Sequence, residues 1–219
     1  MNLITSEGGL TGAGYAVFII AGIIALLLAV FIAGKVSSGK KMSARQLVFC
    51  AMSLALAFVT SYIRLIKMPW GGAITLFSML FITLVGYWYG VGAGLLVGLA
   101  YGILQFIQEP YFLTFWQVCF DYLFAFAALG LSGLCRKGKH SLQIGYLIGV
   151  FGRLVFASIA GYVYWMSYMP ESFPKSLAAI YPVVYNGAYL GAEAILTLIV
   201  LAVPAVRQAI NRVGQYATR

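Results

Sequence analysis

The sequence carries little charge for its length. Only 9% of its 219 residues are Asp, Glu, Lys or Arg, just five of these are acidic, and there is one histidine. By contrast, 63% of the residues are hydrophobic, and the mean hydropathy is +0.96. A soluble domain needs far more polar surface than this, so a soluble protein is excluded. The composition predicts an integral membrane protein.

Histidine and cysteine are too scarce, or wrongly placed, for several kinds of site. His140, the only histidine, lies in a basic loop, which excludes a histidine-based catalytic or zinc site in the membrane. The three cysteines (Cys50, Cys119 and Cys135) show no C-x-x-C spacing and are interpreted as small packing residues. Residues 133–140 nearly match a phosphate-binding loop, but His140 replaces the Ser or Thr that holds magnesium, and no strand precedes it. We expect no cofactor and no metal.

Seven apolar runs approach the length of about 20 residues that a membrane-spanning helix needs. They are residues 13–33, 46–63, 73–88, 91–107, 116–134, 144–165 and 178–203. We expect an all-α protein in which residues 1–40 form an extra N-terminal helix and a basic cytoplasmic linker, and residues 41–219 form a six-helix core. The first run is long enough to span and lacks a cleavage site, so it is expected to be retained as an anchor.

Positive charges predict the orientation, because Lys and Arg near helix ends stay on the cytoplasmic side. Ten of the fourteen basic residues fall on one side of the predicted helices: Lys35, Lys40, Lys41, Arg45, Arg136, Lys137, Lys139, Arg207, Arg212 and Arg219. The N-terminus is therefore expected outside the cell membrane and the C-terminus in the cytoplasm. Topology and contact with anionic lipid headgroups explain the net charge of +9. Nucleic-acid binding is not expected.

Two stripes of small residues predict close helix contacts. Gly90, Gly94, Gly98 and Gly102 recur at every fourth position, which is typical of a face against which another helix packs. Ala51 and Ala55 form a smaller face of the same kind on the second apolar run. For this smaller face, internal packing and docking to another protein both remain open.

Asp121 is an acid in the middle of an apolar run. A charge at that depth costs at least a few kcal/mol and marks a functional site by default. Gln117 lies four residues earlier and shares its helix face, and Tyr122 flanks it. Arg153, in the next helix, is interpreted either as a counter-ion for Asp121 or Glu193 or as part of a ligand site.

The last two helices predict a recess beside this acid. Arg153, Ala157, Gly161 and Trp165 follow one another at four-residue steps, so two very small side chains separate a cation from an indole. The final helix places further polar and aromatic groups at helical spacing: Tyr181, Tyr185, Asn186, Tyr189 and Glu193. Aromatic faces with an acid and an amide favour a flat organic cation. Trp70 and Trp165 would also suit the membrane interface without any ligand.

Several of these segments together resemble a known family. They are Gly71-Gly-Ala-Ile-Thr, Tyr101-Gly-Ile-Leu-Gln, Glu109-Pro-Tyr, Gln117-Val-Cys-Phe-Asp-Tyr and Tyr181-Pro-Val-Val-Tyr-Asn-Gly-Ala-Tyr. Over residues 43–205 the chain resembles the thiamine-specific substrate-binding components of energy-coupling factor transporters. The acid-Tyr pair after Gln-Val and the Tyr-x-x-x-x-Asn-Gly-x-Tyr segment carry most of this likeness.

The resemblance implies a six-helix core that binds one thiamine near its outer face, under the loop 62–72. Trp70 would cover the site, and the residues lining it would be Tyr111, Asp121, Tyr122, Trp165, Tyr181 and Asn186, to which we add Arg153. Trp165 would stack on the aminopyrimidine ring and Asp121 would accept from its amino group. The face of Ala51 and Ala55 would dock to the coupling membrane subunit, which in turn binds two ATPases.

The sequence departs from the family pattern in three respects. Asp121 stands where the family usually has Glu, Ala157 stands where a histidine is expected, and residues 1–40 add a helix. A thiamine precursor or related pyrimidine is therefore an alternative substrate. A second reading is a self-sufficient, proton-coupled secondary transporter of a small organic cation, although no internal repeat supports it. An intramembrane enzyme is not expected, because no paired acid and base are found.

Overall fold

The computed structural model describes residues 5–6, 9–10, 42–69 and 71–219. The predicted N-terminal span at 13–33, its basic linker up to residue 40, and Trp70 lie outside the described residues. Near the N-terminus, β1 (Thr5–Ser6) pairs with β2 (Gly9–Leu10) in antiparallel register.

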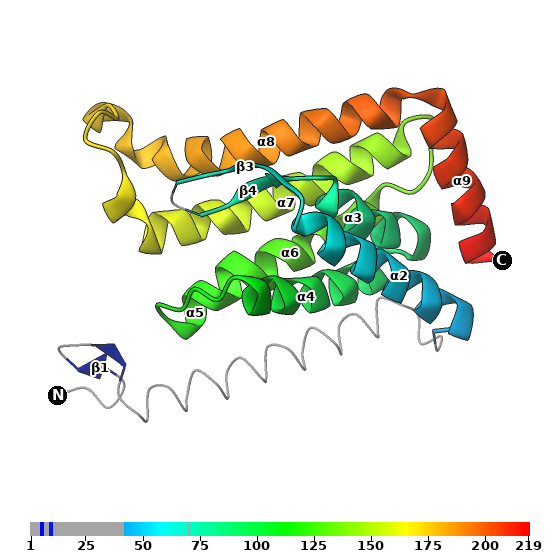
Figure 1. Cartoon of the computed structure of the whole chain (residues 1–219), viewed down its shortest axis with the longest axis horizontal. Helices are drawn as coiled ribbons and strands as arrows, with labels where there is room; N and C mark the ends of the chain where they lie inside the picture. The colour runs from blue at the N-terminus through cyan, green and yellow to red at the C-terminus, as the bar shows by residue number, and fades with distance from the viewer. Residues whose placement is uncertain (1–4, 7–8, 11–41, 70) are drawn as a thin grey trace.

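The described core is built from helices that run roughly along its long axis (Figure 1). They are α2 (Ala44–Ser61), α3 (Ser78–Tyr89), α4 (Val91–Gln108), a segmented fifth helix (Phe115–Leu134), α7 (Ser141–Tyr164) and α8 (Tyr181–Ala202). Five of these segments, with α8 counted from Lys175, are long and apolar enough to cross a membrane, and α3 is a shorter apolar helix. An all-α membrane protein and a six-helix core are thereby confirmed for the described residues.

The fifth helix changes its winding three times. It begins as α5 (Phe115–Val118), continues as a π-helical turn (Cys119–Phe124) and α6 (Ala125–Ala127), and ends as a 3₁₀ helix (Ala128–Leu134). The sequence predicted one regular helix here. π-Helical turns within helices frequently occur at functional sites, because they redirect side chains. This one contains Asp121.

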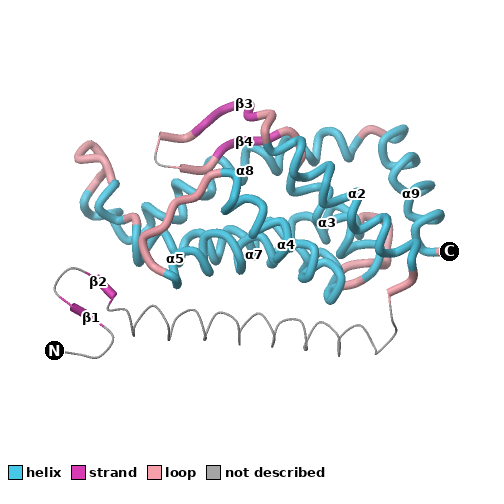
Figure 2. The backbone as a smooth tube through the Cα atoms, turned by 60° about the horizontal axis from the view of Figure 1, so that its bottom comes forward, coloured by secondary structure: helices cyan, strands magenta, loops and turns pink. Residues whose placement is uncertain are grey.

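The expected loop at 62–72 is largely a β-hairpin. Strands β3 (Arg64–Lys67) and β4 (Ala73–Thr75) pair antiparallel, and the chain reverses at Gly71 and Gly72, whose φ values of 94° and 81° suit glycine. The third helix consequently begins at Ser78, not near 73 as predicted. A short apolar run does not distinguish strand from helix, which explains the difference. Figure 2 shows the hairpin lying along α8.

Close packing of α4 against the fifth helix confirms the role predicted for the glycine stripe. A Cβ on Gly94 would lie only 2.7 Å from the Cα of Gly130, and one on Gly98 would lie 2.5 Å from the carbonyl oxygen of Phe126. The connection between α3 and α4 is Gly90 alone, at φ 97°. Backbones that approach so closely leave little freedom in how these helices cross.

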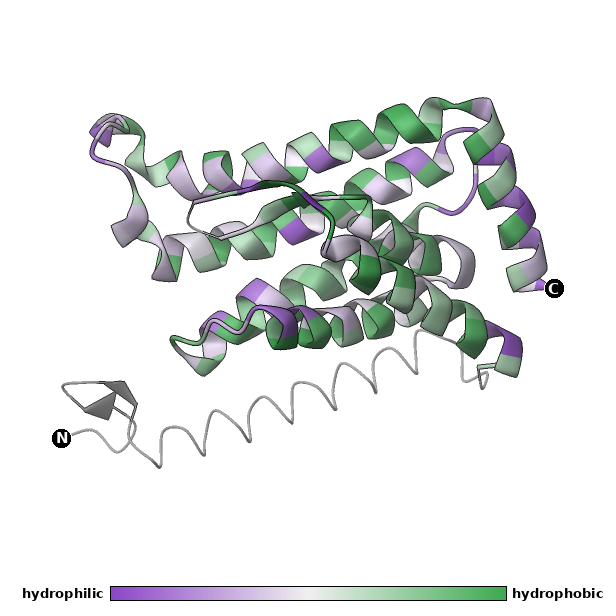
Figure 3. Ribbon diagram, viewed as in Figure 1, coloured by the Kyte–Doolittle hydropathy of each residue, from purple (hydrophilic) through white to green (hydrophobic). Residues whose placement is uncertain are grey.

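A further helix, α9 (Pro204–Thr218), was not predicted from the basic tail. Gly214 and Ala217 are buried, and the Tyr89 hydroxyl donates to the Ala217 carbonyl oxygen over 3.0 Å. The helix crosses one end of the bundle (Figure 1). Figure 3 shows the hydrophilic residues gathered in α9 and the loops, while the bundle is mostly hydrophobic. α9 therefore forms a polar end of the molecule beside its apolar body (Figure 3).

Candidate ligand-binding site

One cavity of about 540 Å³ brings the predicted site residues together. It lies between α4, the fifth helix, α7, α8 and the hairpin, and its size is ordinary for a small-molecule site. The predicted residues that line it are Tyr111, Asp121, Tyr122, Arg153, Trp165, Tyr181 and Asn186. Ala157 and Gly161 also line it, as the predicted recess requires. Trp70 alone among the predicted binding residues lies outside the described chain.

Asp121 is held by two neutral donors. Its Oδ2 atom accepts a hydrogen bond from Gln117 Nε2 over 2.7 Å and another from Trp165 Nε1 over 3.0 Å. Gln117 is itself completely buried, and its Oε1 accepts from the backbone of Leu113 over 3.1 Å. The carboxylate is thus fixed in place, with its other oxygen, Oδ1, left for further hydrogen bonds.

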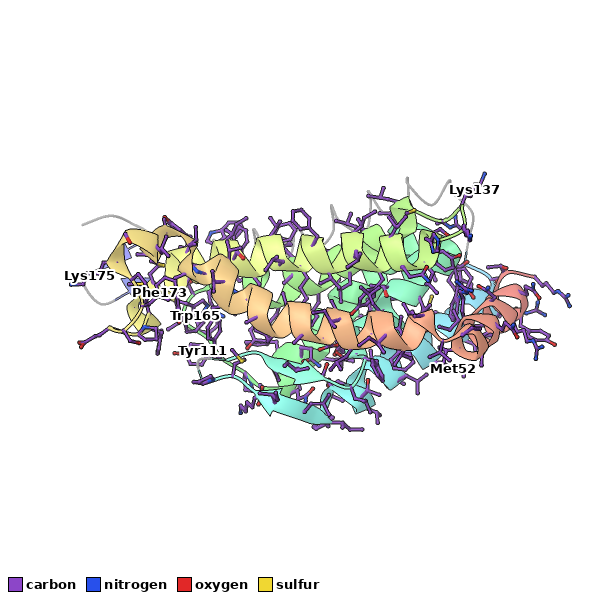
Figure 4. All side chains as sticks on the ribbon, turned by 90° about the horizontal axis from the view of Figure 1, so that it is seen from above. Met52, Tyr111, Lys137, Trp165, Phe173 and Lys175 are labelled. Atoms are coloured by element: carbon purple, nitrogen blue, oxygen red, sulfur yellow. The ribbon has the colours of Figure 1, made fainter. Side chains whose placement is uncertain are left out.

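An aromatic cluster forms the outer part of the cavity. The ring centroids of Tyr111 and Trp165 lie 5.0 Å apart, and those of Trp165 and Tyr168 lie 5.5 Å apart. The hydroxyls of Tyr111 and Tyr168 are 3.4 Å apart. In Figure 4, Tyr111, Trp165 and Phe173 lie at the end of the molecule opposite Lys137. Such faces suit a flat, cationic ring.

Tyr122 and the hairpin meet at Glu109, which follows α4. The Tyr122 hydroxyl donates to the Glu109 carbonyl oxygen over 2.8 Å. The Glu109 carboxylate forms salt bridges with Arg64 and, over 3.3 Å, with Lys67. Partial burial raises the pKa of Glu109, but the hydrogen bonds and charges of Arg64 and Lys67 outweigh it and hold that pKa below its usual value. Glu109 therefore ties β3 to the rim of the cavity.

Asn186 is largely occupied by the protein itself. Its Nδ2 donates to the carbonyl oxygens of Pro182, over 2.9 Å, and Ala157, over 3.2 Å. Its Oδ1 accepts from the Tyr189 hydroxyl over 2.8 Å. The amide thus joins α8 to α7 where the predicted recess lies, so its main effect is to shape the cavity wall.

Arg153 lines the cavity without the expected counter-ion. Its guanidinium carbon lies 4.1 Å above the ring of Phe126. Within the described residues, it forms no salt bridge with Asp121 or Glu193, so the counter-ion hypothesis is wrong for this structure.

Glu193 serves the fold behind the cavity wall. It is 1% exposed, and its carboxylate accepts from the backbone and hydroxyl of Thr75 over 2.9 and 2.8 Å. Longer contacts of 3.4 Å reach the Ser78 hydroxyl and the Met79 backbone at the start of α3. A carboxylate satisfies unpaired N–H groups at a helix N-terminus well. Glu193 thereby fastens the hairpin and α3 to α8.

Sequence reasoning missed some lining residues. Tyr168 follows Trp165 by three residues, a spacing that could have indicated it. Gln105 belongs to one of the resembling segments, and its Nε2 donates to Ser61 Oγ over 2.9 Å. Ser61 and Gln105 both line the cavity, but they meet only because α2 packs on α4, which no local pattern reveals.

Ala51 and Ala55 do not line the cavity and belong to a different surface of the protein. Both are exposed on α2, and only 22% of this span is buried, the smallest share among the five long spans. A second, more open hollow of about 750 Å³ lies beside α9 and includes Arg136 and Lys137. It contains none of the predicted site residues, and no cluster of three metal-ligating side chains occurs in the described parts of the chain.

Comparisons with known proteins point to one family. The family model described as thiamine transporter protein (Thia_YuaJ) matches residues 47–211. The chain is 32% identical over 155 residues to the thiamine transporter ThiT of Bacillus subtilis (strain 168), a match that covers 62% of this chain and 76% of that protein. It is similar in fold to the structure of ThiT from Listeria monocytogenes, with a TM-score of 0.58, 24% identity, and coverage of 74% of this chain and 96% of the other.

Proposed function

This chain belongs to the thiamine transporter family, and we propose that it is a high-affinity, membrane-embedded binding subunit for thiamine uptake. The observation that carries the proposal is the contact between Asp121 and Trp165 inside a cavity walled by aromatic rings. It places a hydrogen-bond acceptor and a stacking surface side by side. Binding of a ligand, rather than catalysis, is the activity we assign.

Asp121 and Trp165 suit two properties of thiamine, namely its amino group and its positively charged aromatic system. Asp121 accepts from the amino group of the aminopyrimidine ring, while the aromatic cluster of Tyr111, Trp165 and Tyr168 stacks on a positively charged ligand. Each favourable cation–π or stacking contact contributes about 0.5 to 2 kcal/mol. An acid whose remaining oxygen would lack a partner discriminates against analogues without the amino group.

The small side chain of Ala157 widens the substrate range that we propose. Ala157 lies in the cavity wall, where the family resemblance implies a histidine. Without that ring, recognition depends more on Asp121, so thiamine precursors or related pyrimidines with the same amino edge are included as substrates.

Uptake is proposed to require partner proteins. The exposed Ala51 and Ala55 on α2 are the proposed docking face for a coupling membrane subunit of an energy-coupling factor transporter, which binds two ATPases. Small residues on an exposed helix let a second helix approach closely. We further propose that the lipid-embedded protein has its N-terminus outside and its C-terminus in the cytoplasm, since the basic residues then satisfy the positive-inside rule.

Titration of the purified full chain with thiamine, followed by tryptophan fluorescence, tests the proposal. We expect saturable quenching below micromolar thiamine, because Trp165 lies at the site. Unchanged fluorescence together with no heat of binding at micromolar thiamine would exclude the assignment.

Uptake into proteoliposomes tests the mechanism. We expect thiamine accumulation only when the coupling subunit, both ATPases and ATP are present. Accumulation by the chain alone, driven by a proton gradient, would instead establish a secondary transporter.

A further inference from the structure

One cation in the cavity wall has no acceptor. In the parts of the chain that the structure describes, the Arg153 guanidinium donates no hydrogen bond and forms no salt bridge, and its contact is with the face of the Phe126 ring, 4.1 Å away. A guanidinium offers five N–H donors. A ring face satisfies none of them as an oxygen acceptor would, so these donors are available to a molecule in the cavity.

The other charges near the cavity are already matched. Arg64 and Lys67 both bind Glu109 at the rim. Glu193, behind the wall, accepts from Thr75 and from the start of α3. What remains is Asp121, held by neutral donors alone, and Arg153.

These two unmatched charges lie at different depths of the recess, since the Arg153 guanidinium lies over Phe126, five positions after Asp121 in the fifth helix. Arg153 precedes Trp165, the donor to Asp121, by twelve positions along α7. At a rise of 1.5 Å per residue, their Cα atoms are separated by about 18 Å along the helix. Ala157 and Gly161 lie between them and line the cavity, so no bulky side chain from this face divides it.

We propose that Arg153 forms an oxyanion subsite at the inner end of the cavity, which takes a phosphate or carboxylate group. Arginine binds such groups through two parallel hydrogen bonds. Taken with the proposed function, on which this identification rests, the ligand is dipolar. Its aminopyrimidine ring lies at Asp121 and its anionic group at Arg153, as in a phosphate monoester of thiamine.

The charge balance of the cavity supports this ligand. Three cationic and two anionic side chains line it, namely Arg64, Lys67, Arg153, Glu109 and Asp121. Thiamine alone adds another positive charge in surroundings of low dielectric constant, where unmatched charge is costly. A phosphate monoester carries roughly 1.5 to 2 negative charges at neutral pH and offsets the excess.

Calorimetric titration of the full chain with thiamine and with thiamine monophosphate tests the subsite. We expect wild type to bind both, and Arg153→Gln to bind the monophosphate at least tenfold more weakly while thiamine binding stays within threefold or tightens. Lys175→Gln, which removes an exposed cation outside the cavity, is the control and should affect the ratio of the two affinities less than threefold. Arg153→Lys keeps the charge and should give an intermediate loss; it also serves if Arg153→Gln does not fold.

Equal weakening of both ligands by Arg153→Gln, or failure of wild type to bind the monophosphate while it binds thiamine, overturns the subsite. Inorganic phosphate distinguishes a solution anion from one carried by the ligand. If it tightens thiamine binding to wild type but not to Arg153→Gln, the oxyanion comes from solution and the subsite stands.

The subsite is also testable apart from thiamine. An increase in the melting temperature of wild type with inorganic phosphate, absent in Arg153→Gln, supports it even if thiamine fails to bind, a result that would refute only the proposed function. If phosphate and the monophosphate both act independently of Arg153, there is no oxyanion subsite.

Discussion

The indole nitrogen of Trp165 donates to the carboxylate of Asp121 over 3.0 Å, although 44 residues separate the two in the chain. Trp165 immediately follows α7, and Asp121 lies in the π-helical turn of the fifth helix. One contact thus fixes the direction of the acid, orients the stacking ring and joins two helices. Ligand recognition and packing share the same atoms at this point.

Replacement of Asp121 by Asn should weaken thiamine binding at least tenfold, or about 1.4 kcal/mol, because the neutral amide loses the charge that receives the ligand's amino group. Isothermal titration calorimetry measures the loss. Glu171→Gln, which removes an exposed acid outside the cavity, is the control and should leave the affinity unchanged. Equal affinity of Asp121→Asn and wild type would remove the acid from the recognition mechanism.

Replacement of Trp165 by Phe keeps a ring but deletes the N–H that holds Asp121. We expect about tenfold weaker thiamine binding, since a hydrogen bond to a charged group contributes about 1.5 to 3 kcal/mol. The amplitude of ligand-induced fluorescence quenching should fall as well. Trp116→Phe changes an indole that does not line the cavity and should preserve both signals. Quenching of normal amplitude in Trp165→Phe would show that another tryptophan reports binding.

Replacement of Glu109 by Gln should loosen the hairpin, because Arg64 and Lys67 lose their shared acid. Hydrogen exchange at the amides of β3 should quicken at pH 7, with Lys175→Gln as a distant control. In wild type, the lowered pKa of Glu109 means that its contribution is complete above the unfolded value of about 4.3 and is lost as the pH falls through the folded value. Exchange corrected for its intrinsic rate should therefore not change between pH 7 and 6.

Replacement of Gly94 by Ala should destabilise the helix core by about 1 to 3 kcal/mol, the usual cost of overpacking. The added Cβ would lie 2.7 Å from the Cα of Gly130, and neither backbone can move easily. Gly187→Ala is the matched control, since a Cβ there meets nothing within 4 Å, and it should be neutral or slightly stabilising. Melting temperatures in detergent compare the two. Equal stability of both variants would contradict the packing assigned to the stripe.

Replacement of Ala55 by Trp should abolish uptake by the assembled transporter yet leave thiamine binding by the isolated chain within twofold. The reason is steric, because the indole blocks close approach of a partner helix. Ile195→Trp enlarges an exposed residue on α8 and serves as the control for general effects of a bulky side chain. Normal uptake by Ala55→Trp would place the docking face elsewhere.

Hydrophobicity and helical spacing were sufficient for much of the fold and for part of the cavity lining, whereas Tyr111 was expected there only from the family resemblance. Apolar runs located the spans, because each must match the thickness of the bilayer. Four-residue spacing correctly placed Gln117 beside Asp121, and Ala157 and Gly161 between Arg153 and Trp165, because a regular helix repeats every 3.6 residues. The glycine stripe was predictable for the same reason.

Irregular local structure was not predictable in this way. The π-helical turn at Cys119–Phe124 contains Asp121, whose contact with Trp165 reaches another helix. The hairpin β3–β4 is held by contacts of Glu193 with Thr75, and Glu193 also reaches Met79 in α3. The helix α9 was not predicted, because its amphipathic pattern is limited to 15 residues. Its basic residues also fit the pattern of positive charge that predicts membrane topology.

The sequence by itself determined that this protein crosses a membrane, where its long apolar spans lie, and which residues in them supply aromatic, acidic and amide groups, since these follow from composition and from spacing along one helix. Only the tertiary structure decided which groups satisfy one another. It brought Trp165 to Asp121 and the start of α3 to Glu193, and it placed the Asn186 amide in hydrogen bonds between α7 and α8. It also left Arg153 in the cavity wall without an ion-pair partner. Hydrogen bonds and ion pairs depend on distances of a few ångströms between residues far apart in the chain, and only the packing of whole helices sets those distances.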